Sequence, residues 1–102
     1  EVKNSFEGTL QKVGMALNDV GGIVKIEGHT DNVPVGFSSR YRSNWDLSSA
    51  RSAAVADYIL GSTNLQPGNV SVAGFADSKP IASNDTTDGR ARNRRIEVLV
   101  DG

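Results

Sequence analysis

The first third of the chain carries apolar residues at helical and then at strand-like spacing. Four apolar positions recur every three or four residues: Phe6, Leu10, Val13 and Leu17. They fall on one stripe of a helix over about residues 5–19, which Gly21 and Gly22 end. The β-branched segment 23–27 then predicts a strand that runs into Gly28.

A long polar segment separates this strand from a second helical pattern. Residues 29–44 show no sustained period, which predicts a loop, and loops of this length in compact domains are usually functional or mobile. The helical spacing returns from Asn44 or Asp46 to Leu60, and Gly61 is expected to end the helix. The predicted apolar face consists of Leu47, Ala50, Ala54 and Tyr58, with Val55 and Ile59 as further candidates.

Two further strands are predicted in the last third of the chain, over residues 70–75 and 96–100. A loop over residues 76–89 and a short helical turn over residues 90–95 separate them. The resulting order, α-β-α-β-β, predicts an α+β fold, a two-layer sandwich with a mixed β-sheet and helices on one face.

The composition describes one ordinary domain. The chain has 102 residues, 11 Lys and Arg against 12 Asp and Glu, one His and no Cys. It begins at Glu1 without Met, so we interpret residues 1–102 as a single domain cut from a longer protein. No apolar run approaches the roughly 18 residues of a membrane span. The formal charge of −1 argues against broad binding to phosphates, and no nucleic-acid partner is expected.

Polar residues gather at the ends of the predicted elements, in residues 28–32, 44–51 and 90–95, which could converge at one edge of the sheet. Arg51 lies near a helix N-terminus, where the macrodipole favours acids rather than bases. An anionic ligand beside Arg51 would resolve this mismatch, and Asp31 could take an ammonium of the same ligand. The pattern therefore favours a receptor for a zwitterion. The alternatives are that Asp31 caps a turn and that Arg51 is a solvated surface residue.

Catalysis and metal binding find little support. The chain has a single His, no Cys and no nucleophile-elbow pattern, so no enzyme is expected. His29 and Asp31 lack a third ligand at a recognisable spacing, so neither a metal nor a cofactor is expected, and a hydrogen-bonded His29 at the strand end is favoured.

Two further features have competing interpretations. Arg90, Arg92, Arg94 and Arg95 favour a salt-bridged surface turn over a nucleic-acid contact, because acidic residues flank them and aromatic residues are missing. A third interpretation is that one of these arginines points at the site of Asp31 and Arg51.

Trp45 is interpreted as a core anchor of the long loop rather than a stacking platform.

Four motifs in order resemble the OmpA-like peptidoglycan-binding domain over about residues 6–100. They are Gly28-His29-Thr30-Asp31, then Asn44 with Leu47, Ser48 and Arg51, then Gly74-Phe75-Ala76-Asp77 with Pro80, then Asn93-Arg94-Arg95-Ile96-Glu97. The resemblance implies a βαβαββ-type fold whose first strand is truncated or missing. It also implies non-catalytic binding of the diaminopimelate of peptidoglycan stem peptides. Asp31 would receive the ammonium and Arg51 the carboxylate, and further pocket positions would be Thr30, Asn44, Leu47 and Arg94.

The long stretch between Asp31 and Asn44 is similar to that of the MotB/PomB type of flagellar stator subunit. This similarity implies a periplasmic domain of an inner-membrane-anchored protein that anchors an ion-driven motor to the cell wall. A homodimer and a partner stator membrane subunit, bound through segments outside these residues, are implied as well. The alternative is an OmpA/Pal-type envelope tether that links the outer membrane to peptidoglycan.

Overall fold

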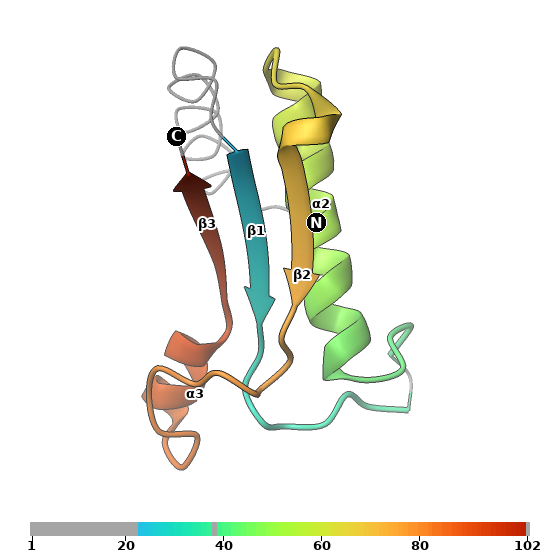
Figure 1. The fold of residues 1–102 in the computed structure, drawn as a ribbon. Helices are drawn as coiled ribbons and strands as arrows, with labels where there is room; N and C mark the ends of the chain where they lie inside the picture. Colours follow the sequence, from blue (N-terminus) through green and yellow to red (C-terminus); the bar gives the residue numbers. More distant parts are fainter. Residues whose placement is uncertain (1–22, 38, 102) are drawn as a thin grey trace.

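The described part of the chain alternates strands and helices. A computed structural model describes residues 23–37 and 39–101, so the helix predicted over residues 5–19 lies outside the described residues. The elements, shown in Figure 1, are β1 (Ile23–His29), α2 (Asn44–Ser62), the 3-10 turn η1 (Pro67–Asn69), β2 (Val70–Gly74), α3 (Thr87–Asn93) and β3 (Arg95–Asp101).

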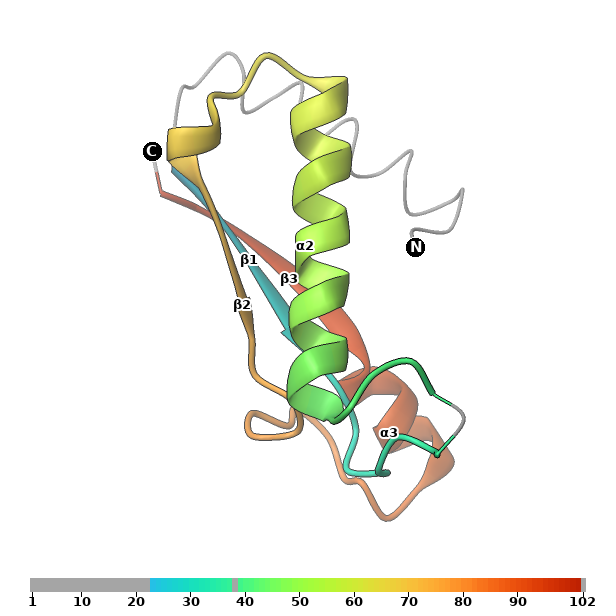
Figure 2. The same cartoon turned by 90° about the vertical axis from the view of Figure 1, so that its right-hand side faces the viewer.

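These elements form the two layers that the sequence predicts. β1 is the central strand of the described sheet, parallel to β2 on one side and antiparallel to β3 on the other. α2 lies along one face of this sheet (Figure 2), and α3 lies beyond its lower end (Figure 1). The predicted α+β fold with a mixed sheet is therefore confirmed.

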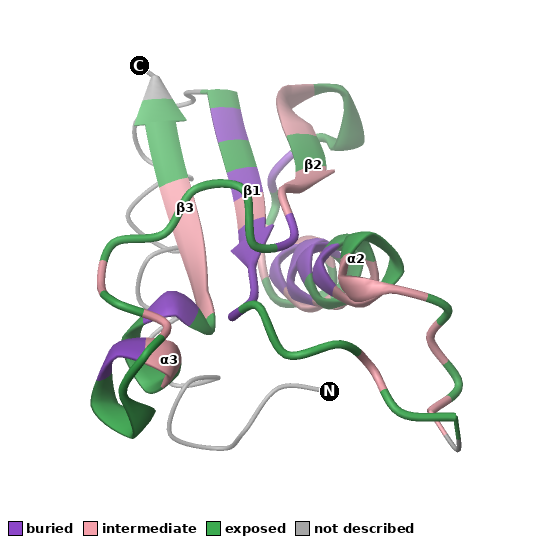
Figure 3. Cartoon of the chain, turned by 90° about the horizontal axis from the view of Figure 1, so that it is seen from below, coloured by how far each residue is buried: buried purple, intermediate pink, exposed green. Residues whose placement is uncertain are grey.

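The apolar core lies between the central strand and α2. Val24 and Ile26 of β1 are fully buried and pack against Val55 and Ile59 of α2. Figure 3 shows that buried residues concentrate on β1 and on the side of α2 that faces it, and that burial continues past the end of β1. The core thus holds β1 in place, and β1 carries the start of the 28–31 motif.

The buried face of α2 differs from the predicted one. Val55 and Ile59, the two further candidates, are buried as predicted, but Leu47, Ala50, Ala54 and Tyr58 are only partly buried. The other buried residues of α2 are Ser48, Ser52 and Ala56. The reason is that the N-terminal half of α2 packs directly on strand glycines. A Cβ added to Gly28 would lie 2.3 Å from the Ser48 carbonyl oxygen, and one added to Gly74 would lie 2.2 Å from Ser49 Oγ. Only small side chains fit such a close approach, and an apolar pattern does not reveal it.

The predicted end of α2 at Gly61 is wrong, because the helix continues to Ser62. Ser62 Oγ donates to the Tyr58 carbonyl and Thr63 Oγ1 donates to the Ile59 carbonyl, both at 2.7 Å. Thr63, the C-cap, is extended, so the helix ends without a left-handed glycine.

The helical turn predicted over residues 90–95 is shifted toward the N-terminus, since α3 spans Thr87–Asn93. Thr86 is its N-cap, and its Oγ1 accepts a hydrogen bond from the Gly89 N–H at 3.0 Å. Helix formation therefore starts before the arginines. Arg94 follows the last turn and Arg95 already belongs to β3.

Replacing Ser43 by alanine is expected to lower the free energy of unfolding by about 1 kcal/mol. Ser43 is the N-cap of α2, and its Oγ accepts a hydrogen bond from the Asp46 N–H at 3.2 Å. Urea denaturation would measure the change. Ser71→Ala, which removes an exposed hydroxyl of β2 that bonds no described residue, is the control and should change stability by less than about 0.5 kcal/mol. Equal effects of the two substitutions would contradict the capping role.

Candidate ligand-binding site

Asp31 is a nearly buried carboxylate directly beyond β1, with 7% of its surface exposed. Its Oδ1 accepts a hydrogen bond from the Val33 N–H at 3.0 Å, which is the turn-capping bond that an aspartate makes two residues onward. Its Oδ2 accepts a hydrogen bond from Arg94 at 2.7 Å, within an ion pair. Asp31 therefore caps a turn and also holds a charged partner.

Thr30 and Asn44 fix the backbone on either side of Asp31. The Thr30 N–H donates to the Ala76 carbonyl at 2.8 Å, and Thr30 Oγ1 donates to the Asp31 carbonyl at 2.8 Å. Asn44, the first residue of α2, donates from Nδ2 to the carbonyls of Asp31 at 3.3 Å and Val33 at 3.0 Å. Both side chains thus position the loop that carries the acid.

Arg94 reaches Asp31 from the junction between α3 and β3. Its side chain is 46% exposed, so the ion pair is open to solvent on the arginine side. The three polar segments that the sequence places at element ends therefore meet, because Asp31, Asn44 and Arg94 belong to one each. Of the interpretations of the arginine cluster, the contact with Asp31 is present. The salt-bridged turn is present too, because Arg95 pairs with Glu97.

Arg51 does not touch Asp31. It shares one stripe of α2 with Asn44 and Leu47, since residues three, four and seven apart lie on the same side of a helix. Its side chain is exposed and forms no ion pair or hydrogen bond with residues 23–37 or 39–101. Leu47 is half-buried between the two polar residues. The stripe therefore offers a cation and an apolar contact beside the Asp31 loop.

Asn93 is a site-supporting residue whose role the sequence did not reveal. It is completely buried at the end of α3, and its amide bonds the loop that precedes α3. Oδ1 accepts hydrogen bonds from the backbone N–H groups of Ile81 at 2.8 Å and Ala82 at 3.0 Å. Because Arg94 follows directly in the chain, this anchor sets where the arginine emerges. The only sequence signal was its place in the motif of residues 93–97.

His29 is buried, but the hydrogen bond expected of it is absent from the described residues. Its ring stacks on Phe75 with centroids 5.3 Å apart and an interplanar angle of 12°. Neither Nδ1 nor Nε2 has a hydrogen-bond partner there. Burial, and to a lesser extent the positive charge of Arg95, lowers the pKa of His29 below its usual value, so the imidazole is neutral at neutral pH.

Trp45 is exposed, with 55% of its surface accessible, so its interpretation as a core anchor is wrong. It lies in the first turn of α2, where Asn44 already fastens the loop through hydrogen bonds. The loop needs no apolar anchor at this point, and the indole is left on the surface next to the site.

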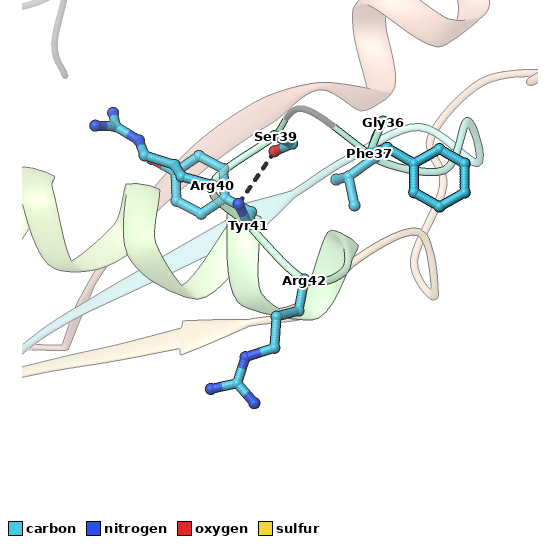
Figure 4. Close-up of a pocket in the computed structure, with 7 residues that line it drawn as sticks. Gly36, Phe37, Ser39, Arg40, Tyr41 and Arg42 are labelled. Atoms are coloured by element: carbon cyan, nitrogen blue, oxygen red, sulfur yellow. Dashed lines mark hydrogen bonds between the residues drawn. The ribbon is translucent and has the colours of Figure 1, made fainter.

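The long loop between β1 and α2 forms a hollow of its own. Residues 35–37 and 39–42 line a cavity of about 550 Å³ (Figure 4). The Arg40 guanidinium lies 5.3 Å from the centre of the Tyr41 ring, and the Tyr41 N–H donates to Ser39 Oγ at 3.1 Å. Phe37 is fully exposed. None of the six predicted site residues lines this hollow, so it is separate from the charged site.

No helix within residues 23–37 and 39–101 combines the length and the apolar character that a membrane crossing requires.

Comparison with known proteins identifies the family. Residues 1–94 match the OmpA family, and the chain belongs to that family. Among individual proteins, it is 41% identical over 86 residues to Motility protein B of Bacillus subtilis strain 168. This match covers 84% of the chain and 32% of that protein, so the chain spans about a third of the relative's length.

Solved structures agree with the fold. The chain is similar to the cell wall anchor of the T6SS from Pseudomonas aeruginosa, with a TM-score of 0.87 and 41% identity, covering 98% of this chain and 68% of that chain. It also resembles the C-terminal domain of Helicobacter pylori MotB, with a TM-score of 0.91 and 19% identity, covering 100% of this chain and 77% of that chain. The OmpA-like fold with MotB domains as structural neighbours is therefore confirmed.

Proposed function

We propose that this chain is a non-catalytic peptidoglycan-binding module that anchors a flagellar motor stator to the cell wall. The observation that carries the proposal is the nearly buried carboxylate of Asp31, whose backbone is bonded by Asn44 at the start of α2, with the exposed Arg51 on the same helix stripe as Asn44. Membership in the OmpA family supports it, as does similarity to a motility protein and to a cell wall anchor.

The ligand would be the diaminopimelate residue of the stem peptide, whose free end carries an ammonium and a carboxylate. The ammonium binds Asp31, and the carboxylate binds Arg51 and the N–H groups that the first turn of a helix leaves without intrahelical partners. Thr30 and Asn44 hold the loop in place. Leu47 packs against the methylene groups of the ligand.

Arg94 can pair either with Asp31 or with the carboxylate of the ligand. Arg94 forms an ion pair with Asp31 at 2.7 Å, which offsets the charge of the nearly buried acid. An arriving ammonium takes over the pairing at Oδ2. Arg94, which is half-exposed, then turns to the ligand carboxylate and adds a second cation beside Arg51.

In the cell, the chain would be the single periplasmic domain, residues 1–102, of an inner-membrane-anchored protein. It would act as a homodimer and meet its partner stator membrane subunit through other segments. An OmpA/Pal-type tether would bind the same ligand but fractionate with the outer membrane. Fractionation of cells that express the full-length protein distinguishes the two.

Retention on purified insoluble peptidoglycan tests the site. Asp31→Asn keeps the acceptor for the Val33 N–H and removes only the charge, and Arg51→Gln removes the exposed cation. Each is expected to weaken binding at least about tenfold, the loss expected when a binding charge is left unpaired. Asp57→Asn and Arg92→Gln, which change exposed charges elsewhere, are the matched controls and should bind like the wild type. Equal retention of all five proteins would rule out the site.

Competition tests the ligand. Free diaminopimelate is expected to displace the chain from peptidoglycan, whereas cadaverine, the same diamine without either carboxylate, should fail at the same concentration. Displacement by cadaverine to the same extent would contradict recognition of the zwitterionic end. Release of soluble fragments from the peptidoglycan would contradict the non-catalytic role.

A further inference from the structure

Two carboxylates face each other on the side of the sheet that α2 does not cover. Glu27 of β1 and Glu97 of β3 are directly opposite residues of the antiparallel pair. They alternate with the buried residues of β1 that face α2, so they point to the other face. Like charges at directly opposite positions destabilise a sheet. Arg95 pairs with Glu97 and offsets one of the two charges, so a further cation between the carboxylates would stabilise the pair.

The third member of the group is His29, two residues beyond Glu27 on the same face. Its Nε2 lies 3.9 Å from Glu27 Oε1 and 3.7 Å from Glu97 Oε2, and the three atoms lie within 4.8 Å of one another. Ligand atoms around a tetrahedral zinc ion are about 3.4 Å apart, as bond lengths of about 2.0–2.1 Å require. Small rotations of the two glutamates would close the difference.

The imidazole is the second, independent observation. The His29 side chain is only 2% exposed, and neither ring nitrogen has a hydrogen-bond partner among the described residues. Buried polar atoms of this kind are rare, because each unmade hydrogen bond is unfavourable. Stacking on Phe75 holds the ring in place. A fixed imidazole with an unused lone pair, directed at two carboxylates, is an arrangement suited to a metal ion.

The neighbouring cations are compatible with this role. Arg95 donates from Nε to Glu97 Oε2 at 2.5 Å and also bonds the carbonyls of Asn93 and Lys79. It is thus fixed by the backbone and can orient Glu97 from outside the metal shell. The Lys79 ammonium is placed over the Phe75 ring, 4.1 Å from its centre, rather than between the carboxylates.

We propose that Glu27, His29 and Glu97 bind one divalent first-row transition-metal ion, with Zn²⁺ as the expected occupant. The imidazole selects against Mg²⁺ and Ca²⁺, which prefer oxygen ligands alone. Three protein ligands leave one position for water. The ion joins β1 to β3 at the strand ends from which Asp31 and Arg94 extend.

Calorimetric titration of the metal-free 102-residue chain with ZnCl₂ tests the proposal. The wild type is expected to bind one ion per chain. Glu97→Gln and His29→Gln should each weaken binding at least about tenfold, because each removes a ligand. Asp57→Asn, a carboxylate on the exposed side of α2, is the matched control and should bind zinc like the wild type.

Two further measurements keep the test decisive if His29→Gln does not fold. Glu97 is partly exposed, so Glu97→Gln should retain the wild-type circular dichroism spectrum and decide the result alone. X-ray absorption of the zinc-loaded wild type should show nitrogen and oxygen ligands at about 2.0–2.2 Å. Absence of saturable zinc binding, an unchanged affinity in Glu97→Gln, or equal binding of MgCl₂ would each overturn the proposal.

Discussion

Replacing Gly28 by alanine is expected to destabilise the chain by about 3 kcal/mol, at the upper end of what overpacking causes. The new Cβ would lie 2.3 Å from the Ser48 carbonyl oxygen and 2.6 Å from Ser52 Oγ. The serine side chain can rotate away, but the carbonyl belongs to the backbone of α2. Relief therefore requires the whole helix to move off the sheet, which loosens the packing of Val55 and Ile59 on β1.

Denaturation in guanidinium chloride measures this effect, and the chain offers a matched control. Gly61 lies in the last turn of α2, and a Cβ added there would meet nothing within 4 Å. Gly61→Ala should therefore stabilise the chain by about 0.5–1 kcal/mol through helix propensity. If Gly28→Ala unfolds at the same denaturant concentration as the wild type, α2 does not pack as closely on Gly28 as described.

Asn93→Ala is expected to destabilise the chain by about 3 kcal/mol, because four partly buried polar groups lose their partner at once. The amide accepts hydrogen bonds from Ile81 and Ala82 and donates two more, to the Ala82 carbonyl at 3.0 Å and to Asn84 Oδ1 at 2.8 Å. Alanine can replace none of these bonds. Water would have to enter a site that is now completely buried.

Comparison with Asn84→Ala distinguishes the loss of all four hydrogen bonds of the Asn93 amide from the loss of one of them. Asn84 contributes one of the four hydrogen bonds through its side chain, so its loss should reduce stability by about 1 kcal/mol. Thermal unfolding followed by circular dichroism would measure both variants. A loss in Asn93→Ala no larger than that in Asn84→Ala would show that Asn93 does not anchor the loop.

Most of the described fold followed from periodicity, and the largest exception is the buried face of α2. Strand and helix positions were predicted well because apolar spacing reports which residues face a core. The buried face of α2 was mispredicted because Ser48 and Ser52 are buried against glycines rather than against apolar side chains. Burial that depends on the absence of side chains on the opposing element leaves no apolar pattern.

The candidate site was predictable as a set of residues but not as a geometry. The motifs indicated Asp31, Asn44 and Arg94, yet the contact between Asp31 and Arg94 was only one of several interpretations. The neighbours of His29 were missed altogether. Glu97 reaches this histidine only through the register of β1 against β3, and a single sequence does not specify strand register.

The ion pair between Asp31 and Arg94 joins residues 63 positions apart in the chain. β1 gains its neighbours only from residues 70–74 and 95–101, so closing the sheet requires large loops to form first. Asp31 and Arg94 therefore come together only where β1 and β3 have paired. In the described sheet β3 is an edge strand, and edges open more readily than central strands. Each such opening would withdraw Arg94 and expose Asp31, which links the availability of the acid to the local stability of the last strand.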